Sequence, residues 1–471
     1  MDQRTPVALA LALLVLTGCA HDGKPGAAGL RDPYFPRLGN GGYDVRHYGL
    51  TLDYAPASGR LRGIAEITAR ATQDLSAFNL DFAGMTVDSA TVEGDKAAVH
   101  RSGTELTLRP RDGIDRGDTF RTVVRYSGTP EKITDPDTSE EGWLRSGSRA
   151  VALGEPTGSM AWFPGNHHPS DKASYDIRIT VPRGLKAISN GELTDERPEG
   201  GRTAFTWHSA EPMASYLATV AIGPYRTVST SAAEPGNGPG TPKDAGKRPR
   251  KISVPVFTAV DPTVAEESAD LVAAVPGIIE WAERTLGPYP FSSTGVIIGR
   301  PRDSGYALET QNRPFLPGPT GVGTLVHELA HQWFGNSVSP KSWHDMWLNE
   351  GFAEYTEWLW EEDTKDVPVR QSFDEAYDDD DNWVFPPADP PTPADISRPP
   401  VYGGGAMVLH RVRETVGDKA FFRILRGWLR TRRHDNASTE DFTAYAERES
   451  GRDLREVWEP WLYGHGRPAR G

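Results

Sequence analysis

The chain has 471 residues, of which 37% are hydrophobic and 25% charged, and its formal net charge is −14. This composition is typical of a soluble globular protein, and the length predicts one very large domain or two to three ordinary ones. Because phosphate binding needs basic patches, the acidic balance argues against nucleic acid as a partner.

The N-terminus has the pattern of a secretion signal. Arg4 precedes an apolar run from Val7 to Leu16, which is shorter than the roughly 20 residues that a bilayer-spanning helix needs. The segment Leu16-Thr17-Gly18-Cys19 resembles a bacterial lipobox, which implies cleavage before Cys19 and lipidation of its thiol. Cys19 is the only cysteine, so no internal disulfide can form. We expect an exported protein, lipid-anchored to the bacterial cell membrane and facing outside the cytoplasm. The alternative is ordinary cleavage that leaves an idle cysteine.

Two domains are predicted after this signal. Residues 19–42 are rich in Gly, Pro and Ala, which is typical of a flexible tether. Residues 43–228 repeatedly alternate apolar and polar side chains, as in "YDIRITV" from Tyr175, which predicts half-buried strands of an antiparallel β domain. Residues 229–251 are dominated by Gly, Pro and Lys and are interpreted as a mobile loop.

Residues 252–471 change to helical periodicity. One helix is expected from Glu266 to Leu286, with a kink at Pro276. Another is expected from Ser438 to Glu449, because Ser438 and Asp441 form a capping box and Gly451 fits a helix end. The segment 378–400, with four consecutive Asp and many Pro, predicts an exposed loop; a cation or substrate site is the alternative.

The sequence "HELAH" places two histidines four residues apart. On an α-helix such residues share one face, so His327 and His331 can bind one metal ion, while Glu328 can act as a general base toward water. A catalytic zinc site uses three protein ligands, and Glu350 on the next predicted helix can supply the third. One zinc ion per chain is expected as the cofactor.

Several motifs together resemble the M1 family of zinc aminopeptidases. They cover roughly residues 43–466 and comprise "HELAHQWFGN…WLNEGFAEY", "LGPYPF", "YALETQN", "VYGGGAMVLHRVRETVG" and "EPTGSMAWFPGNHHPSDKASYDIRITVP". The resemblance implies an α+β fold, with an N-terminal antiparallel β saddle followed by a mainly helical thermolysin-like catalytic domain. It also suggests a short, two-domain form with an open cleft.

The resemblance implies a role for each matched residue. His327, His331 and Glu350 bind zinc, and Glu328 is the general base and later a proton donor. Tyr402 stabilises the oxyanion, Glu309 holds the free α-ammonium of a peptide substrate, and Glu155 assists it. The sequence departs from the family pattern at Tyr306, which replaces a Gly, at Thr310, which replaces an Asn, and in "YGGG" and "FPGNHHP".

Other interpretations of these residues remain open. Glu309 and Glu155 can be solvated carboxylates, and Tyr402 a core or turn residue. Glu354 can contact a zinc-binding histidine or simply face solvent. His167 and His168 are interpreted as loop residues without a role, and His344 as structural.

The leading hypothesis is a lipid-anchored zinc aminopeptidase that hydrolyses the N-terminal peptide bond of peptides. A zinc endopeptidase on the same scaffold would need no amine pocket. A non-catalytic peptide-binding lipoprotein is the third possibility, although such a protein has no use for the general base Glu328.

Overall fold

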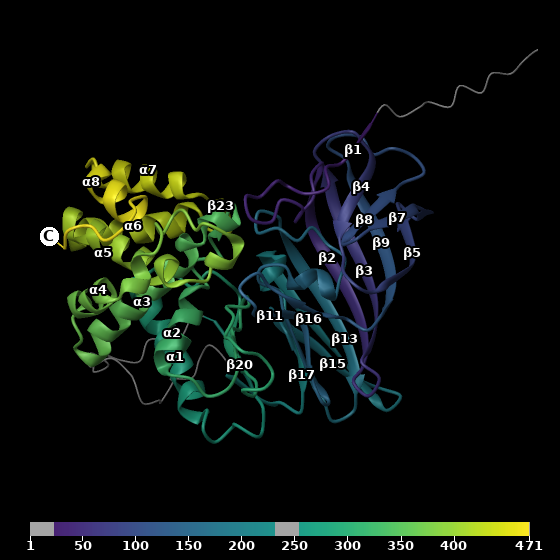
Figure 1. Ribbon diagram of the computed structural model, residues 1–471. Coiled ribbons are helices and arrows are strands. Elements are labelled where there is room, and N and C mark those ends of the chain that lie inside the picture. Colours follow the sequence, from purple (N-terminus) through teal and green to yellow (C-terminus); the bar gives the residue numbers. More distant parts are fainter. Residues whose placement is uncertain (1–22, 231–253, 471) are drawn as a thin grey trace, which may run out of the picture.

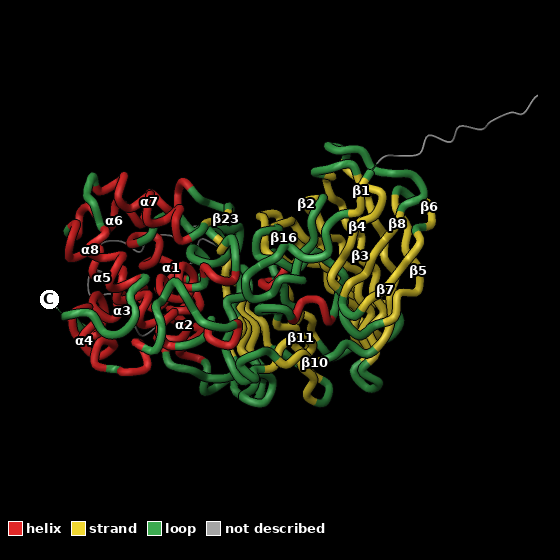
Figure 2. Tube along the Cα trace, turned by 45° about the horizontal axis from the view of Figure 1, so that its top comes forward, coloured by secondary structure: helices red, strands yellow, loops and turns green. Residues whose placement is uncertain are grey.

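The computed structural model describes residues 23–230 and 254–470 of the chain. The predicted signal, the lipobox with Cys19 and most of the predicted loop 229–251 lie outside these residues. Figure 1 shows strands gathered in one half of the molecule and helices in the other, and Figure 2 shows the same division from a second direction. The predicted order, a β-rich domain followed by a mainly helical one, is confirmed.

The N-terminal domain consists of three sheets within the described residues. The largest has the strand order β15-β16-β13-β2-β3-β9-β5-β6, the second β1-β4-β8-β7, and the third β10-β11-β12-β17-β14. Their bounds are β1 Lys24–Pro25, β2 Tyr43–Ala55, β3 Arg60–Ala71, β4 Leu75–Asp81, β5 Thr86–Val92, β6 Asp95–Lys96, β7 Ala98–Ser102, β8 Glu105–Arg109, β9 Thr119–Gly128, β10 Lys132–Thr134, β11 Glu140–Ser146, β12 Arg149–Leu153, β13 Lys172–Pro182, β14 Lys186–Ser189, β15 Glu192–Glu199, β16 Arg202–Ala214 and β17 Val220–Gly223.

The alternating sequence pattern explains why these segments are strands. In β3 the residues alternate strictly between buried and partly or fully exposed, so one face packs on the core while the other meets solvent. Most neighbouring strands pair antiparallel, as predicted, but β13 runs parallel to β2 and β1 runs parallel to β4.

The catalytic domain combines a small mixed sheet with the helices. Strand β18 (Arg226–Thr230) pairs antiparallel with β19 (Val256–Val260), which runs parallel to β20 (Thr294–Ile298), itself parallel to β21 (Phe315–Leu316). Because β18 reaches Thr230, the first two residues of the predicted loop are strand, and the domain boundary precedes Arg226. A two-stranded pair, β22 (Ser339–Pro340) and β23 (Asn436–Ala437), also lies here.

The helices of the described chain follow these strands. They are α1 Ala269–Thr285, α2 Val322–Ala330, α3 Trp347–Lys365, α4 Val369–Asp378, α5 Gly405–Val416, α6 Asp418–Thr431, α7 Thr439–Ser450 and α8 Arg455–Val457. Helix α1 continues through Pro276, and Val275 and Ile278 near it are buried. Helix α7 has the predicted capping box of Ser438 and Asp441 and ends at Gly451 with φ +68°. No helix in the described ranges combines the length and apolar character needed to cross a bilayer.

The prediction of a flexible tether is wrong for residues 23–42. Strand β1 pairs with β4, and Asp32 accepts hydrogen bonds from the backbone N–H of Trp343 at 2.9 Å and the hydroxyl of Ser342 at 2.8 Å. Asp32 is buried, and His168 lies 3.3 Å from it. The Gly- and Pro-rich composition reflects tight turns in a segment that the catalytic domain holds in place.

The prediction for the segment 378–400 needs correction. The segment 378–400 is not a simple exposed loop: Asp378–Asp381 are exposed, but Phe385 and Ile396 are buried. His167 and His168 do lie in a loop, yet both are buried, and the ring of His167 bonds with Ser215 and the Phe163 carbonyl at 3.0 Å each. His344, interpreted as structural, stacks on Tyr34 with ring centroids 5.5 Å apart.

Polar contacts join the two domains. The Lys172 ammonium of β13 donates to the carbonyl oxygens of Asn336 and Ser337, at 3.0 and 2.9 Å. The Asn190 amide donates to the carbonyl of Gln311 at 2.8 Å. These bonds fix the N-terminal domain against the segments that precede α2 and α3, where the predicted site lies.

Candidate active site

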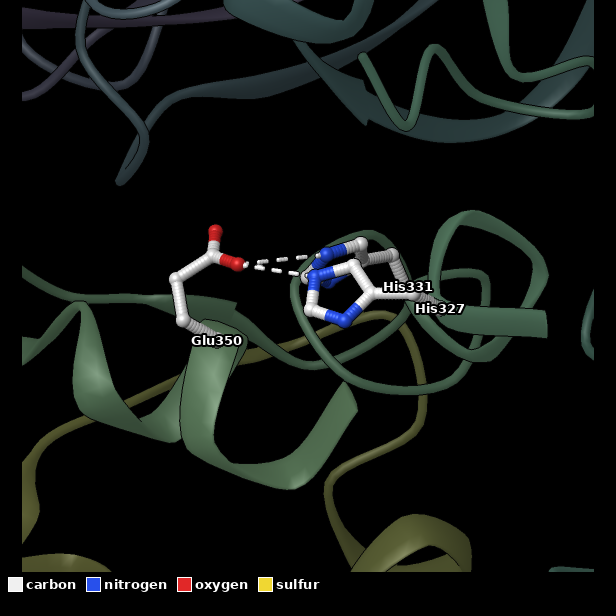
Figure 3. Close-up of side chains that lie close together, drawn as sticks. All are labelled: His327, His331 and Glu350. Atoms are coloured by element: carbon white, nitrogen blue, oxygen red, sulfur yellow. Dashed lines mark hydrogen bonds and ion pairs between the residues drawn. The ribbon is translucent and has the colours of Figure 1, made fainter. Parts of the chain in front are cut away.

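Helices α2 and α3 bring the three predicted metal ligands together. His327 lies in the last turn of α2, His331 is its C-cap residue, and Glu350 lies in the first turn of α3. Oε2 of Glu350 is 3.2 Å from Nε2 of His327 and 3.4 Å from Nε2 of His331. In Figure 3 both imidazoles point toward this carboxylate.

This arrangement fits a zinc ion. Two nitrogens and one carboxylate oxygen, with one ligand atom from each residue, lie within 4.8 Å of one another. Such a donor set is typical of catalytic zinc sites that keep a position open for water. Although burial opposes it, the nearby Glu350 and Glu309 carboxylates raise the pKa of His331 to about 10, so the site stabilises positive charge.

Asn349 orients His331 and was not among the predicted residues. Nδ1 of His331 lies 2.7 Å from Oδ1 of Asn349 and 3.2 Å from the Phe334 carbonyl, both acceptors, so Nδ1 carries the proton. Nε2 is therefore free to bind a metal. The Asn349 amide nitrogen also donates to Oε1 of Glu309 at 3.0 Å, which links the metal ligands to the predicted amine site.

Glu328 lies beside the ligands on α2 and is buried. Its Oε2 has no hydrogen-bond partner, so one carboxylate oxygen is available to a molecule in the site. Burial raises the pKa of Glu328 to about 8, against the opposing effect of the two histidines. Glu354, one turn after Glu350, is 3.9 Å from Nδ1 of His327, which is ion-pair range rather than a hydrogen bond.

Glu309 and Glu155 meet on the other side of the ligands. Glu309 is only 3% exposed, which excludes its interpretation as a solvated loop residue. The two carboxyl groups share a hydrogen bond, and one oxygen from each lies within 4.8 Å of Glu350. Burial and then the charge of Glu309 raise the pKa of Glu155 well above its usual value. Three converging carboxyl groups, two from buried residues and one from the half-buried Glu155, make a site for a cation such as an ammonium group.

Tyr402 lies over His327, in a short π-helical segment from Pro400 to Gly404. Its ring stacks on the imidazole of His327, with centroids 5.8 Å apart and planes 14° apart. Burial and then the charges of Glu350 and Glu155 raise the pKa of Tyr402 well above 10, so the phenol keeps its proton and can donate a hydrogen bond.

The seven residues predicted for metal binding, catalysis and amine binding line one cleft of about 630 Å³. Glu155 comes from the N-terminal domain, and Glu309, His327, Glu328, His331, Glu350 and Tyr402 come from the catalytic domain. Pro393 and Ile396, from the segment predicted to be an exposed loop, also line it. The arrangement can bind a metal ion, place a base beside it and hold a cation a short distance away.

Comparisons with known proteins match both halves of the chain. A model of the Peptidase M1 N-terminal domain matches residues 45–217, and a model of the Peptidase family M1 domain matches residues 319–461. A solved M1 zinc metallopeptidase from Deinococcus radiodurans is similar, with 26% identity and a TM-score of 0.84, over 94% of this chain and 98% of that one. A mutant of that organism's enzyme was solved bound to a Tyr-Ser-Ala substrate and matches with the same identity and TM-score.

Curated relatives match over a smaller share of their own length. The "Probable aminopeptidase 2" of Sulfurisphaera tokodaii is 26% identical over 334 residues, which is 65% of this chain and 40% of that protein. The leucyl aminopeptidase of Saccharolobus solfataricus is 24% identical over 462 residues, which is 90% of this chain and 54% of that protein. The chain thus spans about half or less of the length of these two relatives.

Proposed function

The chain belongs to the M1 family of zinc metallopeptidases, and from this premise we propose that it is an aminopeptidase that removes the first residue of peptides. The observation that carries the proposal is the buried Glu309 and the half-buried Glu155 beside the ligands His327, His331 and Glu350. Metal ligands alone support cleavage of any peptide bond that enters the cleft. The carboxyl pair adds a reason to begin at a free N-terminus.

His327, His331 and Glu350 would hold one zinc ion. A bound zinc ion acts as a Lewis acid and lowers the pKa of water toward about 7, so that water can attack at neutral pH. The protein's contribution is geometric: the α2 backbone sets the spacing of the two histidines, and Asn349 fixes the ring of His331.

Glu328 moves the proton. Its unpartnered Oε2 takes a proton from the attacking water as the new carbon–oxygen bond forms. The same carboxyl group then gives that proton to the amide nitrogen as the carbon–nitrogen bond breaks. The products are a free amino acid and a peptide shortened by one residue, and Glu328 returns to its starting state.

Tyr402 assists the same step. The carbonyl oxygen of the substrate gains negative charge as water attacks, and a phenol donor stabilises that charge more than it stabilises the neutral carbonyl. The stacking of Tyr402 on His327 holds the donor beside the metal ligands.

Glu309 and Glu155 recognise the free amine. An α-ammonium group supplies three N–H donors to the two carboxyl groups, and a nearby negative charge stabilises it. An acylated amine carries no charge and leaves a buried carboxylate unpaired, which costs about 1–3 kcal/mol or more. The arrangement therefore favours free over blocked N-termini by roughly 10- to 100-fold or more.

A panel of fluorogenic aminoacyl substrates, each with its N-acetyl twin, tests this function. We expect chelator-sensitive cleavage of the free compounds and little cleavage of the acetylated ones. Glu309→Ala should depress activity on free-amine substrates far more than on blocked ones, and Glu155→Ala should do so more weakly. Equal cleavage of both twins, or internal cleavage of a blocked peptide, would instead support the endopeptidase alternative.

We also propose that the protein is exported and lipid-anchored at the bacterial cell membrane through Cys19. The support is in the sequence alone: the short apolar run, the lipobox-like segment and the single cysteine. Membrane fractionation of the wild type and Cys19→Ser tests it. The wild type should partition with membranes and the variant should not, and equal association of the two would reject lipidation at this site.

A further inference from the structure

The cleft is more acidic than the proposed chemistry requires. Four of its carboxyl side chains belong to that chemistry, but three more come from the turn between β10 and the start of β11, and these are Asp135, Asp137 and Glu140. No lysine or arginine is among the residues that line this cleft. A site with this balance attracts positive charge and repels acidic ligands.

Asp135 carries a buried acceptor without a donor. The residue is 7% exposed; its Oδ2 receives a long bond of 3.4 Å from the Ser139 hydroxyl, while its Oδ1 has no partner. The hydroxyl of Tyr306, which also lines the cleft, is buried and unpartnered too. Buried polar atoms are rarely left unsatisfied, since each costs free energy, so the two together indicate a missing donor-rich ligand.

Glu141, which does not line the cleft, lies beside Asp135. It is fully buried and accepts hydrogen bonds from the Thr157 hydroxyl at 2.6 Å and the Thr157 backbone N–H at 3.0 Å. The two carboxyl groups lie close enough for the charge of Glu141 to act on Asp135. Burial and then the charge of Glu141 raise the pKa of Asp135 to about 10, and a cation bound beside the two carboxyl groups would oppose this shift.

Asp135 and Glu141 lie near the proposed amine site. The Tyr306 hydroxyl lies within electrostatic range of Asp135 and Glu141, and also of the proposed amine carboxylates Glu155 and Glu309. Tyr306 precedes Glu309 by three residues on the same segment. Because the α-amine and the side chain leave the same carbon, a long side chain on an amine held at Glu309 can reach toward Asp135.

We propose that this cleft selects peptides whose first residue is lysine or arginine, with Asp135 and the Tyr306 hydroxyl accepting hydrogen bonds from the side-chain cation. The proposal rests on the aminopeptidase function argued above. Lysine offers three N–H donors and arginine five, and both carry the charge that the acidic lining favours. Tyr306 stands where the family pattern has glycine, so the selectivity would be a property of this chain.

Paired isosteric substrates test the proposal. Lysine and norleucine amides differ in the terminal ammonium but have nearly the same length, as do arginine and citrulline amides, which differ in charge. We expect kcat/KM to favour lysine over norleucine and arginine over citrulline by roughly 10-fold or more, mainly through KM. If no substrate is cleaved, the proposed function fails; if the charged and neutral partners are cleaved equally, only the present proposal fails.

Two variants locate the selectivity. Asp135→Asn should reduce the lysine-to-norleucine ratio by roughly 10-fold or more. Tyr306→Phe removes one hydroxyl with almost no change in volume and should reduce the ratio less. Asp112→Asn removes an exposed carboxylate outside the cleft and should leave the ratio unchanged. Retention of the full ratio in folded Asp135→Asn or, should that variant not fold, in Tyr306→Phe would overturn the proposal.

Added calcium distinguishes a site for the side-chain cation of the substrate from a site for a divalent metal ion. If the acidic turn bound a divalent ion, added calcium would suppress cleavage of the lysine amide and promote cleavage of the glutamate amide. That result would overturn the proposal and assign the turn as a metal site. We expect calcium at millimolar concentration to change neither rate substantially.

Discussion

The side-chain amide of Asn349 lies 2.7 Å from Nδ1 of His331 through its oxygen, and this bond decides which ring nitrogen faces the metal position. Outer-sphere partners of this kind typically change metal affinity by 10- to 100-fold. We therefore expect Asn349→Ala to bind zinc 10- to 100-fold more weakly, measured by metal content after dialysis against a graded series of chelator concentrations.

Asn349→Asp provides the matched comparison. A carboxylate keeps an acceptor for His331 but loses the N–H that donates to Glu309 at 3.0 Å and adds a charge beside it. Zinc content should stay near that of the wild type while the KM for free-amine substrates rises. Equal zinc loss in the two variants would contradict the orienting role of the Asn349 oxygen.

The absence of a side chain at Gly335 leaves room for the Asn349 amide that bonds to His331. Its φ is +103°, and a Cβ added there would lie 1.8 Å from Oδ1 of Asn349. Gly335→Ala therefore combines backbone strain of about 1–3 kcal/mol with displacement of the Asn349 amide. We expect reduced thermal stability and weakened zinc binding together, measured by calorimetry and metal content. Gly451→Ala, also at positive φ (+68°) but with open space around it, should lower stability without affecting zinc.

Removing the charge of Glu328 tests its proposed role in proton transfer. Glu328→Gln keeps the shape of the side chain but cannot accept a proton from water. We expect it to retain zinc and lose most peptidase activity, whereas His331→Ala should lose both. Metal analysis beside turnover measurements separates the cases, with Glu456→Gln on the exposed surface as the control. Full activity in Glu328→Gln would exclude the proposed proton transfer.

Tyr402→Phe removes one hydroxyl and almost no volume. Loss of a single oxyanion donor typically lowers turnover by about 10²- to 10³-fold, and substrate binding should change little because the charge develops mainly in the transition state. Steady-state kinetics on one free-amine substrate measures both quantities. Tyr463→Phe, 44% exposed, is the matched control. Unchanged turnover in Tyr402→Phe would leave Tyr402 with a packing role only.

The sequence predicted those parts of the site that depend on local spacing. His327 and His331 share a helix face at any i,i+4 spacing, and Glu350 follows on the next helix, so their meeting needed little tertiary information. Glu309 and Glu155 were matched only through family motifs, because no periodicity relates residues 154 positions apart. Asn349 was not predicted, because no sequence pattern marks a single amide side chain on a helix as the partner of a histidine. Its contact with His331 depends on how α2 and α3 pack together.

Composition misled the interpretation of two segments. Residues 23–42 have few apolar side chains, so their order depends on partners far along the chain, such as Trp343, 311 residues from Asp32. The Asp- and Pro-rich segment 378–400 buries Phe385 and Ile396 against the catalytic domain. In both cases a few long-range contacts outweigh what the average composition indicates.

The Asp32 carboxylate yields a prediction about stability and pH. Burial opposes its ionisation, but hydrogen bonds from His168, from the backbone of Trp343 and Tyr34 and from Ser342 lower its pKa from 3.8 to about 2. A group whose folded pKa lies below its unfolded value stabilises the protein above the unfolded pKa, and the contribution is lost as pH falls through the folded value. A shift of this size corresponds to about 2 kcal/mol at neutral pH.

Asp32→Asn should therefore lower the free energy of unfolding by about 1–3 kcal/mol at pH 7, because the amide keeps the shape but loses the charge that five donors surround. The deficit should shrink steadily between pH 4 and pH 2, where the wild-type carboxylate also becomes protonated. Urea unfolding of both proteins at each pH measures the gap, with Asp112→Asn as the control for loss of an exposed charge. Because Asp32 joins the segment 23–42 to the catalytic domain, limited proteolysis should also cut Asp32→Asn near its N-terminus sooner than the wild type. A deficit that stays constant from pH 7 to pH 2 would mean that the carboxylate charge contributes nothing, and that packing alone holds this segment in place.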